Sequence, residues 1–204
     1  MQVKHINDFV NINETNSRVD IHLGLFYSNN EFCEENLYKE NIAFLHFQTA
    51  RKLEIASEIA QKHNLKLRIY DAYRPYSITK KLNQLFPNLE DGLLADNNGS
   101  WHNVGRAVDI TLIDENKKEL NMPTRPQELT EKASMQNDNS ILLKKIMNEA
   151  GFVSYAKEWW HFFDFFDEDG NRIHLANLEL YDFERERFNF CVNGNNFQQE
   201  SDYQ

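Results

Sequence analysis

The sequence is poor in cysteine, proline and glycine. Its 204 residues include 2 cysteines, 4 prolines and 7 glycines, too few for a disulfide framework or a low-complexity linker. Cys33 and Cys191 lie far apart in the sequence, and we interpret them as reduced thiols that hold no metal. Because nothing in the chain divides it, we expect a single domain over residues 1–204, with residues 183–204 as a C-terminal tail.

Positive charge and long apolar runs are also scarce. Lys and Arg total 22 against 32 Asp and Glu, so the net charge is −10. This balance argues against nucleic acid and against an anionic membrane surface as partners. No apolar run is long enough to span a bilayer, and the first residues lack the apolar segment of a signal peptide. We therefore expect a cytoplasmic protein; nothing in the sequence indicates its oligomeric state.

The hydrophobic pattern mixes helices and strands without regular alternation, which is typical of an α+β fold. Apolar residues recur at helical spacing over residues 41–64 and alternate, as in a strand, over residues 65–70. The remaining expected elements are helices at 77–86 and from Asn139 or Ser140 to about 150, strands at 106–113, 152–155 and 158–166, and a hairpin turn at 169–170.

A polar motif precedes and enters the expected strand at residues 106–113. Residues 100–109 read Ser-Trp-His-Asn-Val-Gly-Arg-Ala-Val-Asp. In that strand Asp109 lies on the face opposite Val108, so Val108 can enter the core while Asp109 faces a pocket. A carboxylate among apolar strand residues requires compensation of its charge, and a divalent metal provides it. Gly105 allows the chain to turn between His102 and the strand.

A second motif, Glu158-Trp-Trp-His161, completes a candidate metal site. His102, Asp109 and His161 form a set of two imidazoles and one carboxylate, the three-ligand pattern of catalytic zinc. We therefore predict one Zn²⁺ per chain, with Glu158 as the base for water. Glu158 and His161 share a face on a helix but not on a flat strand, so a strand needs a bulge or twist here. The alternative for either motif alone is a hydrogen-bonded histidine packed in the core.

The pattern Ser-x-His-x-x-Gly-x-Ala-x-Asp followed by Glu-x-x-His resembles the metallopeptidases that cut D-alanyl-D-alanine bonds. Residues 70–75, Tyr-Asp-Ala-Tyr-Arg-Pro, are similar to the D-alanyl-D-alanine dipeptidases of the vancomycin-resistance type. The resemblance spans about residues 20–165. It implies a small α+β domain like those of hedgehog and the D,D-peptidases, with a central antiparallel sheet and flanking helices. It also implies a zinc enzyme that hydrolyses free D-alanyl-D-alanine in the cytoplasm.

The resemblance also implies roles for individual residues. Glu158 is expected to act as general base and Arg74 as the clamp on the transition state, while Ser100 and Asp71 contact substrate. Two simpler interpretations remain open: Arg74 forms a surface salt bridge, and Ser100 caps a turn.

The chain departs from the family where the substrate amine binds. Relatives carry Met-Gly-Thr-x-Phe-Asp where residues 122–127 read Met-Pro-Thr-Arg-Pro-Gln, so Gln127 replaces an aspartate. A helping tyrosine aligns with Phe26, or with Tyr27 if the alignment shifts by one residue. Neutral Gln127 lacks the charge-assisted bond that a carboxylate gives an ammonium, although Glu128 is adjacent. We therefore expect weaker selectivity for a free amine.

Two other functions remain open. One is a zinc D,D-carboxypeptidase that acts on longer cell-wall peptides. The other is a non-catalytic zinc domain that binds a ligand. The presence of Glu158 and Arg74 argues against the second, because holding zinc requires neither.

Overall fold

The computed structural model describes residues 8–23, 37–38, 40–87, 98–126, 128 and 130–182. Its central feature is a five-stranded sheet with the order β2-β4-β5-β7-β6. The strands are β2 (Val19–Ile21), β4 (Lys66–Asp71), β5 (Ala107–Ile113), β7 (His161–Phe163) and β6 (Val153–Ser154). The pairs from β4 to β6 are antiparallel, as expected, whereas β2 joins β4 in parallel. A small second sheet pairs β1 (Phe9–Asn11) with β3 (Phe44–His46).

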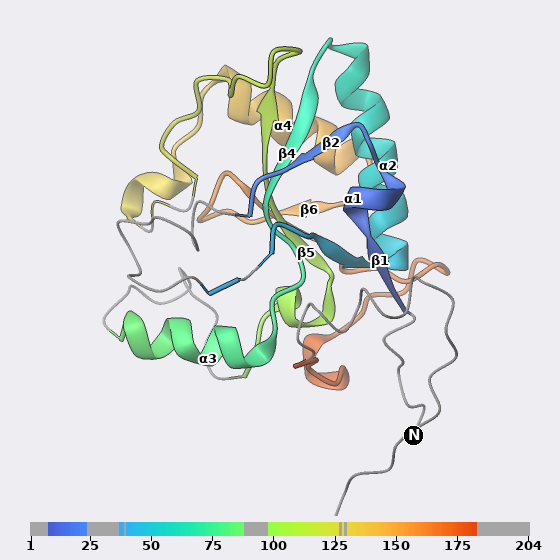
Figure 1. Ribbon diagram of the computed structural model, residues 1–204, viewed down its shortest axis with the longest axis vertical. Helices are drawn as coiled ribbons and strands as arrows, with labels where there is room; N and C mark the ends of the chain where they lie inside the picture. Colours follow the sequence, from blue (N-terminus) through green and yellow to red (C-terminus); the bar gives the residue numbers. More distant parts are fainter. Residues whose placement is uncertain are drawn as a thin grey trace, which may run out of the picture.

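Helices cover one face of this sheet. The α-helices are α1 (Ile12–Thr15), α2 (Phe47–Lys62), α3 (Tyr76–Leu85) and α4 (Asp138–Glu149). Figure 1 shows α2 and α4 beside each other along the sheet, with α3 at its far end. Leu53 of α2 and Leu143 of α4 share one buried core with Leu67 of β4 and Val108 of β5. None of the described helices is long and apolar enough to cross a bilayer.

Two expected helix starts differ from the structure. The segment expected to be helical from residue 41 forms β3 first, and α2 begins only at Phe47. His46 is the N-cap, and its side chain accepts a hydrogen bond from the backbone N–H of Gln48. The cap of α4 is Asn137 rather than Asn139 or Ser140. The hydroxyl oxygen of Ser140 accepts a hydrogen bond from the N–H of Asn137 in a capping box. Ser140 therefore stabilises the start of α4 from within the helix.

The other face of the sheet carries polar side chains. Strand alternation places Asp109 and Thr111 of β5 opposite the helix face. In β4 the register shifts between Ile69 and Asp71, which makes Asp71 rather than Tyr70 the partner of Asp109. A bulge that adds one residue changes which side chains face the partner strand. Asp71 therefore lies next to Asp109 rather than opposite the helix-facing Val108.

The last strands are shorter than the sequence pattern indicates. Of the strand expected at residues 158–166, β7 covers only His161–Phe163. The expected turn at Asp169 and Gly170 is present, with Gly170 at a φ of 79°. A single bridge between Phe166 and Arg172 closes it, in place of a full hairpin. The tail at residues 183–204, and both cysteines, lie outside the described residues.

Candidate metal centre

The structure brings the three predicted metal ligands together. His102, Asp109 and His161 each offer one ligand atom, and these atoms all lie within 4.8 Å of one another. The Oδ1 atom of Asp109 is 2.8 Å from Nδ1 of His161 and 3.5 Å from Nε2 of His102. All three side chains are buried. Two nitrogens and one oxygen in a buried cluster match the donor set of zinc.

A short 3-10 helix, Trp101–Val104, presents His102. The hydroxyl of Ser100 accepts a hydrogen bond from the His102 N–H at 3.2 Å, so Ser100 caps this helix. The Nδ1 atom of His102 lies 2.6 Å from the carbonyl oxygen of Ala72. A carbonyl oxygen only accepts, so Nδ1 carries the proton and Nε2 directs its lone pair toward Asp109. The backbone of Ala72 thereby selects the tautomer that binds metal.

Gly105 ends this short helix in the left-handed conformation, with φ of 65°. A Cβ atom at this position would lie 2.5 Å from Cε1 of Phe9 and 2.8 Å from the backbone nitrogen of His46. Any other residue would combine unfavourable backbone geometry with a collision. Gly105 therefore permits both the turn and the close approach of β3.

A turn, rather than a bulge, places Glu158 beside the ligands. The N–H of His161 points to the carbonyl oxygen of Glu158 at 3.4 Å, and β7 begins only at His161. The prediction of a strand from residue 158 is therefore wrong at its start. Across this turn the Oε2 atom of Glu158 lies 3.5 Å from Nδ1 of His161. Asp109 and His161 meet as a cross-strand pair of β5 and β7.

The two carboxylates of the site have opposite electrostatic properties. Burial raises the pKa of Glu158 to about 7. His161 and Arg74 lower this pKa, and the negative charge of Asp109 raises it further. Burial alone would also raise the pKa of Asp109, but His102 and His161 hold it well below its usual range. Asp109 is therefore ionised at neutral pH, while Glu158 can take up and release a proton there. A base with a pKa near the working pH suits proton transfer in both directions.

Arg74 is held beside the metal site by Asp71. The Oδ2 atom of Asp71 accepts hydrogen bonds from Nε of Arg74 at 2.8 Å and from its Nη2 at 2.7 Å. The Oδ1 atom accepts from the Tyr38 hydroxyl at 3.0 Å and from the N–H of Ala72 at 2.9 Å. Arg74 is buried, so the surface salt bridge considered for it is wrong. Both oxygens of Asp71 face protein donors, and its predicted contact with substrate stays a prediction.

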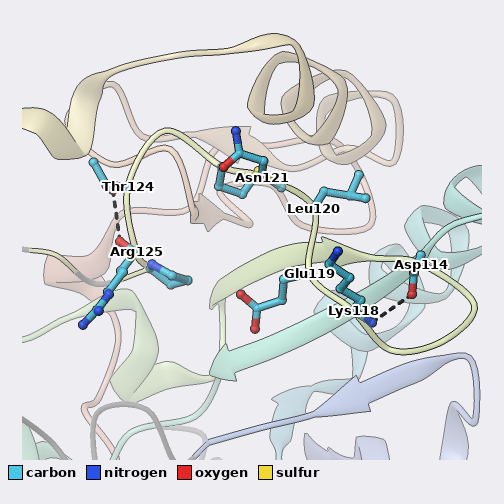
Figure 2. A pocket seen from close by; sticks show the side chains of 9 residues that line it. Asp114, Lys118, Glu119, Leu120, Asn121, Thr124 and Arg125 are labelled. Atoms are coloured by element: carbon cyan, nitrogen blue, oxygen red, sulfur yellow. Dashed lines mark hydrogen bonds between the residues drawn. The ribbon is translucent and has the colours of Figure 1, made fainter.

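A pocket of about 720 Å³ adjoins the second motif. It is formed by side chains between Asp114 and Pro126, and Figure 2 shows the chain looping around it from Glu119 to Arg125. Thr124, on its wall, accepts a hydrogen bond from Nε1 of Trp159 at 2.9 Å. This bond ties the pocket to the residue after Glu158. Gln127 follows directly in the sequence, but Gln127 and Phe26 lie outside the described residues.

The comparisons with known proteins agree with these motifs. A family model described as D-ala-D-ala dipeptidase, of peptidase family M15, matches residues 6–178. The D-alanyl-D-alanine dipeptidase of Escherichia coli (strain K12) is 33% identical over 156 residues, covering 70% of this chain and 78% of that protein. The chain belongs to this family of M15 peptidases. It is therefore a metallopeptidase with an α+β fold.

Solved structures show a more distant similarity. The LdcB LD-carboxypeptidase has a TM-score of 0.42 and 19% identity, over 71% of this chain and 67% of that one. The vancomycin resistance D,D-pentapeptidase VanY, solved with Zn(II), has a TM-score of 0.42 and 15% identity, over 70% of this chain and 86% of that one.

The donor atoms of the site fit a zinc ion. Nε2 of His102 is buried and has no hydrogen-bond partner among the described residues. A buried polar atom without a partner is costly, and coordination of a metal removes that cost. Asp109 supplies the negative charge that the two imidazoles lack.

Several residues outside the predicted set also support the site. Tyr38 bonds Asp71, and Arg106 of the first motif forms a buried ion pair with Asp164, three residues after the second motif. Arg106 was visible as a charge inside the first motif, and Asp164 as a charge after an apolar strand. The carbonyl of Ala72 gives no sequence signal, since every residue has one.

Proposed function

We propose that this protein is a zinc-dependent peptidase that hydrolyses D-alanyl-D-alanine or a related D-amino-acid dipeptide, and that it acts in the cytoplasm. The observation that carries the proposal is the arrangement of Glu158 and Arg74 around the three metal ligands. The E. coli relative is named a D-alanyl-D-alanine dipeptidase, which supports this substrate class. A domain that only held zinc would need neither a base with a pKa of about 7 nor a buried arginine.

His102, Asp109 and His161 would hold the zinc ion, which supplies Lewis-acid polarisation of the scissile carbonyl and activates water for attack. Glu158 takes the proton of the attacking water and delivers it to the leaving amine. The guanidinium of Arg74, fixed in direction by Asp71, stabilises the negative charge that develops on the carbonyl oxygen. Burial of these groups strengthens each charge interaction.

A panel of substrates tests this function directly. The zinc-loaded protein is assayed with D-alanyl-D-alanine, its N-acetyl form, a longer peptide that ends in D-alanyl-D-alanine, and L-alanyl-L-alanine. We expect hydrolysis of the free dipeptide, loss of activity after chelation, and recovery with zinc. The control is His161→Ala, which removes one ligand and should remain inactive after zinc is added back.

Other outcomes of the same panel would assign a different function. Cleavage of the longer peptide without cleavage of the free dipeptide would make the protein a D,D-carboxypeptidase. Zinc binding without hydrolysis of any member would make it a non-catalytic zinc domain. Failure of the parent protein to bind zinc would overturn the proposal as a whole.

Gln127 gives the D,D-carboxypeptidase alternative its support. A missing charge-assisted contact to the substrate ammonium costs about 1.5–3 kcal/mol, which is roughly ten- to more than a hundredfold in affinity. We expect Gln127→Asp to shift the kcat/KM ratio of free to N-acetylated dipeptide toward the free amine. If the parent already rejects the acetylated dipeptide by several orders of magnitude, another acid, such as Glu128, binds the ammonium.

A further inference from the structure

Three buried polar side chains and one partly exposed lysine meet on the helix face of the sheet, behind the metal ligands. They are Asp164, Arg106, Lys52 and Thr49, and we call them the Asp164 cluster. Asp164 accepts hydrogen bonds from Nη1 of Arg106 at 3.0 Å and from the Thr49 hydroxyl at 2.7 Å. Lys52 of α2 also bonds the Asp164 carboxylate. The side chain of Asp164 is 0% exposed and that of Arg106 is 7% exposed, so this charge pair is inside the protein.

The Asp164 cluster lies on the same two strands that carry the metal ligands. The ladder of β5 and β7 pairs Asp109 with His161, Val108 with Phe162 and Ala107 with Phe163. The N–H of Asp164 donates to the carbonyl oxygen of Arg106 at 2.8 Å, which continues this ladder by one rung. Strand alternation therefore places Arg106 and Asp164 on one face of the sheet and Asp109 and His161 on the other.

Arg106 also links the loop of His102 to the start of α2. Its guanidinium contacts the Gln48 side chain and lies 3.4 Å from Nε2 of His46. The N–H of His46 donates to the carbonyl oxygen of Gly105 at 2.9 Å. Arg106 therefore connects both the loop of His102, which ends at Gly105, and the strand of His161.

We infer that the Arg106–Asp164 pair is a positioning device for the metal site: it fixes the register of β7 against β5 and thereby holds His161 opposite Asp109. A slip of one residue would turn His161 to the helix face, because side chains alternate along a strand. The same slip would separate Asp164 from Arg106 and so break a buried charge pair, which is strongly disfavoured. The pair therefore excludes the register that would break the metal site. This inference rests on the proposed zinc site.

The experiment compares Arg106→Lys, Asp164→Asn and the matched control Lys52→Met. Lys52 bonds the same carboxylate but comes from α2, so its loss leaves the pair between the ligand strands in place. Arg106→Lys keeps the charge and is the variant chosen to remain folded. Each protein is measured for zinc affinity by chelator competition and for the visible spectrum of its cobalt(II) form, which reports ligand geometry.

We expect the Arg106 and Asp164 variants to weaken zinc binding by about tenfold or more, the scale found when outer partners of metal ligands are removed. Their cobalt spectra should change. Lys52→Met should lower stability but keep zinc affinity and the spectrum at parent values. Parent-like zinc binding in folded Arg106→Lys and Asp164→Asn would overturn the inference, as would an equal loss in Lys52→Met.

Hydrogen exchange in the metal-free proteins separates this inference from the proposed function. The amides of Ile110 and Tyr155 donate to the carbonyl oxygens of Trp160 and His161. We expect both amides to exchange faster in Arg106→Lys than in Lys52→Met when stability is matched with denaturant. Equal exchange of these amides in the two variants would overturn the positioning role, whether or not the parent binds zinc. Failure of the parent to bind zinc would overturn only the proposed function.

Discussion

Asp109 and Asp164 are buried aspartates at opposite ends of the β5–β7 ladder, and their surroundings differ. Asp164 faces a guanidinium, an ammonium and a hydroxyl, of which the first two carry permanent charge. Asp109 faces two imidazoles, which are cationic only when protonated. When permanent cations surround a buried carboxylate, the protein itself compensates the negative charge. One surrounded by metal-binding nitrogens is suited to an external cation. The helix face of these strands therefore serves structure, and the opposite face serves chemistry.

The largest effect expected from a change on the chemical face is Glu158→Gln. The substitution keeps the shape of the side chain but removes the base, so kcat should fall by about 10²–10⁴-fold. Zinc content and the unfolding midpoint should stay near the parent values, because Glu158 is not one of the three ligands. Steady-state kinetics with metal analysis checks this. Loss of zinc in the variant would identify Glu158 as a ligand, and turnover within a few-fold of the parent would exclude it as the base.

The sharpest test of the comparison is the same substitution at both aspartates in metal-free protein. Asp164→Asn leaves Arg106 and Lys52 facing a neutral group, and breaking a buried pair in this way costs about 3–5 kcal/mol of unfolding free energy. Asp109→Asn should cost less, since the carboxylate of Asp109 faces two imidazoles, which carry charge only when protonated. Urea unfolding of both variants measures the difference. Equal losses at the two positions would show that the two aspartates do not differ in role.

Arg74→Ala should affect chemistry more than binding. Removal of one donor to a developing oxyanion commonly costs about 10²–10³-fold in kcat, and KM should change much less. Asp71→Asn provides the companion variant, because it retains Arg74 but weakens the two bonds that fix its direction. We expect a smaller loss of kcat in Asp71→Asn. A change confined to KM in Arg74→Ala would assign Arg74 to the substrate carboxylate instead.

The smallest effect is expected at a charged group near the edge of the sheet. Burial would raise the pKa of Asp20, but hydrogen bonds from Lys117 and Arg68, with their charges, lower it below its ordinary value of 3.8. A lowered acid pKa stabilises the folded state above the unfolded pKa, and this stability is lost as the pH falls through the folded value. Asp20→Asn should therefore be less stable than the parent by about 1 kcal/mol or less at pH 7.

The difference between Asp20→Asn and the parent should shrink as the pH falls below 3.8 and disappear once the pH is below the lowered pKa of folded Asp20, where the carboxyl group is protonated in both states. Urea unfolding at several pH values follows this change, with Lys62→Met as an exposed control for charge alone. A difference that persists unchanged in acid would show that Asp20 acts through packing rather than through its charge.

The sequence by itself determined which residues are candidates for the site. Residue types and spacing in two short motifs were sufficient to predict the candidate ligands His102, Asp109 and His161 and the base Glu158, because metal binding requires particular atoms. Helical and alternating patterns likewise predicted β5 in full and α3 to within one residue. These features depend on local spacing, which the chain carries directly.

Only the tertiary structure decided how those groups are held. The bulge in β4 that turns Asp71 toward Asp109 depends on pairing with β5, and the turn that places Glu158 beside His161 forms where β7 begins. The carbonyl of Ala72 that sets the tautomer of His102, and the pair of Arg106 with Asp164, join residues that are far apart in the chain. No local pattern encodes such contacts, because they arise from which strands become neighbours and in which register.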